Sequence, residues 1–143
     1  MKDHNYYDTF IAVADDSTCE TAKIPQPRGS AKTVPQMQFE MLHDNPFRFT
    51  QEDVLFTVWL DRQDQSDLTA DEIQASREAF FSKGQACLRT SALAKTHGWG
   101  FIFDQEGKVA LCPVESNDYR RHLQNEGLEQ LKAMRSKRAR KPS

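Results

Sequence analysis

The sequence predicts an α+β fold, with a small antiparallel sheet of about four strands covered mainly on one side by helices. Residues 99–113 hold two β-rich runs around a tight turn, a hairpin pattern. Three threonines precede amphipathic, helix-like segments in the middle of the chain. Because strands, helices, a hairpin and a final helix follow in that order, the pattern differs from the strict alternation of a parallel α/β protein.

The N-terminal quarter is expected to contain two strands and a surface loop. Residues 9–14 are rich in β formers and alternate loosely, and 19–24 form a second short candidate strand. The next segment, 25–32, gathers Pro, Gly and Ser, which is typical of a loop at the surface.

Three helices are predicted between residues 33 and 84. Thr33 caps the first, which ends near residue 44 because Asn45 precedes a proline. Thr50 opens a capping box, and this cap favours a helix over a strand for the apolar run 54–62. Thr69 opens a second capping box, and Gly84 suits the end of the helix that follows.

The C-terminal part is expected to run from a short helical turn, through the hairpin, to helix. Ser91 caps the short turn, and strands 99–104 and 108–113 flank the reversal. Ser116 caps a helix that extends to about residue 123, and 128–138 are expected to continue in helical form.

Length and composition indicate one globular domain. The chain has 143 residues, of which 38% are hydrophobic and 28% charged. We expect one α+β domain over residues 1–138 and a basic, disordered tail over 139–143. Residues 132–143 contain six Lys or Arg and no acid, which leaves 13 basic and 21 acidic residues in the rest of the chain. An acidic body makes nucleic acid an unlikely partner.

The compartment predicted is the cytoplasm. No run of about 18 apolar residues is present, so no membrane partner is expected, and the first ten residues lack the apolar core of a signal peptide. The three cysteines are far apart in the sequence and form no C-x-x-C pair, which favours free thiols.

Short segments along nearly the whole chain resemble a family of small, single-domain microbial proteins of unknown function. They are TFI (9–11), KTV (32–34), QFEM (38–41), NP (45–46), DVLF (53–56), FSKGQACLR (81–89), GWG (98–100), EGKVAL (106–111), VES (114–116) and KAMRSK (132–137). The chain departs from the family wording at Ala92, where a proline is expected, and at Thr96-His97, where a basic-aromatic pair is expected. The resemblance implies no established activity.

A stretch without acids is the candidate binding site. Residues 79–103 contain no Asp or Glu, and the basic residues among them suit an anionic small molecule. A pocket floored by Trp99 is the functional interpretation. The alternative is that the cations pair with acids elsewhere and the glycines serve turns. The predicted ligand-binding residues are Lys83, Arg89, Ser91, Lys95, Trp99 and Arg135.

Cys87 is the candidate catalytic residue of an alternative function. It lies between Lys83 and Arg89, whose charges favour a thiolate, and His97, the histidine nearest in sequence, is the candidate base. The alternative is a buried, inert cysteine. A third hypothesis is a structural or interaction protein, which works through an exposed face or as a homo-oligomer.

No motif in the sequence indicates a cofactor or a metal. The four histidines are scattered, and no nucleotide-binding loop or dinucleotide fingerprint is present. Tyr6, Tyr7 and Phe10 are interpreted as core residues, with a cleft lined by aromatic side chains as the alternative.

Overall fold

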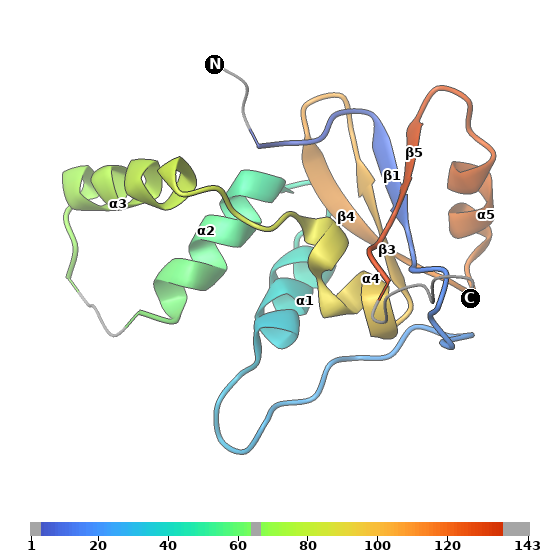
Figure 1. Ribbon diagram of the computed structural model, residues 1–143, viewed down its shortest axis with the longest axis horizontal. Coiled ribbons are helices and arrows are strands. Elements are labelled where there is room, and N and C mark those ends of the chain that lie inside the picture. Colours follow the sequence, from blue (N-terminus) through green and yellow to red (C-terminus); the bar gives the residue numbers. More distant parts are fainter. Residues whose placement is uncertain (1–3, 64–66, 136–143) are drawn as a thin grey trace, which may run out of the picture.

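The computed structural model describes residues 4–63 and 67–135, in which one five-stranded sheet packs between helices (Figure 1). The strand order is β2-β4-β3-β1-β5; every neighbouring pair is antiparallel except β1 and β5, which are parallel. The predicted α+β class is therefore confirmed. The elements are β1 (Thr9–Ala12), α1 (Val34–Asp44), β2 (Phe49–Thr50), α2 (Gln51–Asp61), α3 (Ala70–Ser82), the 3₁₀ turn η1 (Leu88–Thr90), α4 (Ala92–Thr96), β3 (Trp99–Phe103), β4 (Lys108–Pro113), α5 (Asn117–Leu123) and β5 (Glu129–Lys132).

The sheet buries side chains on both faces because successive strand residues point to opposite sides. Ile11, Phe101 and Phe103 pack against side chains of α1, α2 and α4. On the other face, Phe10 packs against Tyr119 of α5. Three helices thus cover one face, as expected, and α5 covers the second.

The helices begin where the sequence places their caps. Thr33, Thr50 and Thr69 each accept a hydrogen bond from a backbone N–H three residues on, and Ser116 does the same for α5. At Thr50 and Thr69 the acid at the third helical position returns a bond to the backbone of the cap. These local contacts start each helix without help from the sheet.

The predicted strand at 19–24 is wrong, because these residues form no strand. β1 already has a partner on each side, β3 and β5, so the segment finds no sheet edge there. Lys23 instead donates its N–H to His97 O at 2.8 Å and accepts from the indole of Trp99 at 2.8 Å. Through these two bonds the segment lies alongside the end of α4 and the start of β3.

The predicted helix over 128–138 is also wrong where the structure describes it. Residues 129–132 form β5, which pairs with β1 in parallel register from Thr9↔Glu129 to Ala12↔Lys132. Glu, Gln, Leu and Lys all favour helices, but an unpaired edge of β1 outweighs that weak preference. Residues 136–138 and the predicted disordered tail, 139–143, lie outside the described residues.

Helices α2 and α3 form an arm that extends away from the sheet (Figure 1). Their contact is aromatic: Trp59 and Phe80 rings lie 5.1 Å apart, and Phe56 and Phe80 rings lie 5.8 Å apart. The C-terminal end of α3 leads into the segment that carries Gln85 and Cys87.

Candidate functional site

Two of the six predicted ligand residues are buried, with their polar atoms bonded inside the fold. Ser91 donates from Oγ to Gln38 Oε1 at 2.6 Å and accepts from Leu93 N, so it caps α4 as expected. Trp99 packs against Phe39 in the core, and its indole N–H is used by Lys23. Both side chains therefore have a structural role.

The four predicted cations do not meet at one site, although two of them lie near each other. Arg89 donates from Nε to Lys132 O at 2.7 Å, and Arg135 lies 3.8 Å from Asp15. Both are beside the C-terminal end of β5, where Lys132 also pairs with Asp15 at 2.8 Å. Lys83 is the C-terminal cap residue of α3, and Lys95 lies in the last turn of α4.

A cleft of about 450 Å³ opens at one end of the same stretch of sequence. Three segments supply its walls: residues 4–7, the first turns of α2, and 85–87. We call residues 4–7 the N-terminal strap. The lining residues are His4, Asn5, Tyr6, Tyr7, Gln51, Leu55, Gln85 and Cys87.

Gln51 ties the three walls together. Its side chain is buried, its amide N–H donates to the carbonyl oxygen of His4, and its amide oxygen accepts from Leu88 N at 2.8 Å. One side chain thus joins the N-terminal strap to α2 and to the backbone just after Cys87. A buried amide with both ends satisfied holds such segments in one arrangement.

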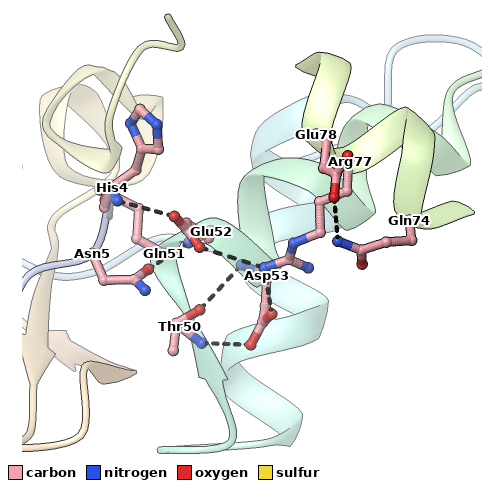
Figure 2. A network of polar contacts seen from close by, with 9 residues as sticks. All are labelled: His4, Asn5, Thr50, Gln51, Glu52, Asp53, Gln74, Arg77 and Glu78. Atoms are coloured by element: carbon pink, nitrogen blue, oxygen red, sulfur yellow. Dashed lines mark hydrogen bonds and ion pairs between the residues drawn. The ribbon is translucent and has the colours of Figure 1, made fainter. Parts of the chain in front are cut away.

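The first turn of α2 holds the strap from its outer side (Figure 2). His4 N donates to a carboxylate oxygen of Glu52 at 3.0 Å, and Glu52 N donates to Asn5 Oδ1 at 2.9 Å. Arg77 of α3 lies 3.7 Å from Glu52 and 3.1 Å from Asp53. The imidazole of His4 stacks on Phe81 with ring centroids 5.0 Å apart.

Tyr6 and Cys87 face each other within the cleft. Burial and, to a smaller extent, a hydrogen bond with Cys87 raise the pKa of Tyr6 to about 12. The positive charge of Arg89 opposes this rise. The phenol therefore stays protonated and can donate to the sulfur of Cys87 across the ordinary pH range.

None of the six predicted ligand-binding residues lines this cleft. Cys87, the candidate catalytic residue of the alternative function, does line it, whereas the contributions of His4, Gln51 and Gln85 are not apparent from the sequence. Tyr6 and Tyr7 line this cleft, whereas Phe10 is fully buried in the core. The sequence offers no clear signal for Gln51. It directly follows the Thr50 cap, a position at which a polar residue is normally exposed, and the structure buries it.

His97 does not line the cleft that contains Cys87. It lies in the wall of a different cleft, with Pro25 and Arg28. The histidine that lines the same cleft as Cys87 is His4, contributed by the N-terminal strap.

Within residues 4–63 and 67–135, no group of three or more His, Cys, Asp or Glu side chains is arranged to hold a metal ion. In the same residues, no helix is both long and apolar enough to cross a membrane.

A model of one protein family matches residues 1–139, almost the entire chain. The chain belongs to DUF6157, a family of unknown function. No curated protein matches this DUF6157 member, and no solved structure matches it. The resemblance seen in the sequence is thereby confirmed. Because the function of the family is unknown, the geometry of this chain is the basis for inferring its function.

Proposed function

We propose that this DUF6157 member is a small-molecule binding module whose ligand occupies the cleft between the N-terminal strap, α2 and residues 85–87. The observation that carries the proposal is the double hydrogen bond of Gln51, which holds three separate segments around one opening. Pre-formed clefts of this size, with apolar walls and a few placed polar groups, are typical of ligand sites.

The lining favours an anionic or neutral ligand over a cationic one. None of the eight lining residues is an acid. The positive charge of Arg89 acts on Tyr6, so a cationic side chain lies within electrostatic reach of this wall. The ligand proposed is therefore a small anion with an aromatic or other planar part, which can pack against Tyr6 and Tyr7.

A second candidate function is an enzyme that uses Cys87 as its nucleophile. The position of Cys87 in the wall of the cleft favours it, because a ligand bound there would lie within reach of the sulfur. In this function His4 takes the place that the sequence suggested for His97.

Thermal-shift measurements test the binding function. The wild-type protein is screened with nucleotides, sugar phosphates and carboxylates, alongside Cys87→Ser and Tyr6→Phe in the cleft and Cys19→Ser outside it. A ligand at 100 times its dissociation constant stabilises the native state by about 2.7 kcal/mol. We expect a shift in wild type and Cys19→Ser that shrinks in the two cleft variants. A shift of equal size in all four proteins would place the ligand elsewhere.

Thiol labelling of the native protein separates the enzyme from the binding module. Cys112 is buried, and burial raises the pKa of its thiol, so it is protected until the protein unfolds. In a Cys19→Ser background, labelling of Cys87 faster than that of a free model thiol supports a nucleophile. Labelling at or below that rate leaves binding as the function.

We place the protein in the cytoplasm because its three cysteines are free. A homo-oligomer remains part of the interaction hypothesis, and exposed Trp59 on the α2–α3 arm is the feature that favours it. Light scattering after size-exclusion chromatography measures the mass directly, and a monomer at all concentrations would remove this hypothesis.

A further inference from the structure

A second cleft, of about 310 Å³, lies at the other end of the 82–100 stretch. It is formed where the loop before α1 passes the C-terminal end of α4. Its lining residues are Pro25, Gln26, Arg28, Thr33, Pro35 and His97. None of these is an acid, and the first turn of α1 contains no acid either.

The imidazole of His97 is held in a defined orientation at this cleft. Its Nδ1 lies 3.1 Å from Ala92 O, and a carbonyl oxygen only accepts hydrogen bonds. Nδ1 therefore carries the hydrogen, with Thr96 Oγ1 2.9 Å away as a second contact. Nε2 is the ring nitrogen left for a ligand.

Arg28 is presented by a closed turn. Its backbone exchanges two hydrogen bonds with Ala31, at 3.3 and 3.4 Å, and Gly29 takes a φ of 64° that suits glycine. Neighbouring Lys32 pairs with Glu40 at 2.7 Å, whereas Arg28 is in no ion pair with the described residues. The N–H donors of its guanidinium group are therefore available to a ligand.

Thr33 adds a hydroxyl donor to the same cleft. Its Oγ1 accepts the N–H of Gln36 at 3.3 Å, so the hydroxyl hydrogen remains to be donated. Guanidinium, hydroxyl and imidazole are the groups that bind oxyanions in proteins.

We propose that this second cleft binds a small oxyanion, the phosphate or carboxylate group of a ligand, through Arg28, Thr33 and Nε2 of His97. Arg28 supplies two parallel donors, and Nε2 donates to the anion when the ring is charged or accepts from a protonated phosphate oxygen when it is neutral. The site is independent of the Gln51 cleft, and either can fail without the other.

Two-dimensional ¹H–¹⁵N NMR titration with inorganic phosphate, and separately with acetate, tests the site. The proteins are wild type, Arg28→Gln, Thr33→Ser and His97→Gln, with Arg48→Gln as the matched control because Arg48 lies outside this cleft. We expect saturable shifts at the amides of residues 26–33 and 97. Loss of a charge-assisted contact in Arg28→Gln should weaken binding about tenfold, while Thr33→Ser and Arg48→Gln retain it.

Each outcome decides the proposal. Saturable binding of phosphate alone assigns a phosphoryl group, binding of acetate alone assigns a carboxylate, and equal binding of both assigns an oxyanion site without preference between the two. The proposal is overturned if wild type shows no saturable shift, or if Arg28→Gln and His97→Gln both bind as tightly as wild type. Because Arg28 is exposed, its variant is expected to fold even if His97→Gln does not.

Discussion

Arg89 is joined to Lys132 across the outer edge of the sheet. Its Nε donates to Lys132 O at 2.7 Å, and its own carbonyl oxygen accepts from Met134 N at 2.8 Å. Glu129 N donates to Asp8 O, just before β1, and Ala133 N donates to Ala12 O, so the alternate residues of β5 turn their N–H groups outward. Arg89 thus occupies part of a sheet edge that would otherwise be open to pairing with another strand.

Arg89→Ala is expected to loosen β5. The variant loses a hydrogen bond from a charged donor, and we expect the free energy of unfolding to fall by about 1 kcal/mol, the lower end for such bonds because the contact is exposed. Amide hydrogen exchange at residues 129–134 should be faster in this variant than in wild type. Lys83→Ala is the control, since Lys83 is exposed at the end of α3. Equal protection of β5 in both variants would contradict this role for Arg89.

Gln51→Leu is expected to destabilise the protein and open the first cleft. Leucine fills a similar volume but leaves Leu88 N–H buried without its acceptor, which should cost about 1–3 kcal/mol in urea unfolding. Gln51→Glu keeps an oxygen for Leu88 and loses the donor to His4, so the two variants separate the two bonds. Wild-type stability in Gln51→Leu would show that the bridge is dispensable.

Gly100→Ala is expected to strain the centre of the sheet. An added Cβ would lie 3.0 Å from Ile11 O, a ring carbon of Phe10 and a ring carbon of Tyr119. We expect a loss of about 1–3 kcal/mol, typical of overpacking, measured by thermal unfolding. Gly84→Asn is the comparison: it has open space and a φ of 68°, which asparagine tolerates. A larger loss at Gly84 than at Gly100 would refute the packing argument.

The raised pKa of Tyr6 predicts a loss of stability in alkali. Burial keeps the folded phenol protonated to about 12, whereas in the unfolded chain it ionises near its usual value of about 10. Between these values the folded state holds the extra proton, so stability falls as pH rises. In Tyr6→Phe, urea midpoints should decline less between about pH 10 and 12. Parallel declines in the two proteins would argue against the shift.

Local interactions explain what the sequence alone predicts well. A capping box joins two residues three positions apart, so Thr50 and Thr69 mark their helices wherever the chain goes. The hairpin is equally local: Asp104 Oδ1 accepts from the N–H groups of Glu106 and Lys108, and Gly107 takes the positive φ of the turn. These elements and the α+β class follow from neighbouring residues.

The candidate site could be predicted only in part. Cys87 stands out because of its basic neighbours, yet Tyr6 and Gln51 meet it only through folding. Ser91 and Trp99 look available in the sequence, and the fold buries both of them. Sequence patterns do not show which side of a short helix or strand turns inward.

The sequence by itself determined the fold class, the start of each long helix and the hairpin, because contacts within a few residues specify them. Only the tertiary structure decided that 129–132 is a strand, since its partner Thr9–Ala12 lies some 120 residues earlier in the chain. It also determined where both clefts form, because their walls come from segments that are far apart in the sequence. Weak local preferences give way there to backbone pairing and to the burial of apolar surface.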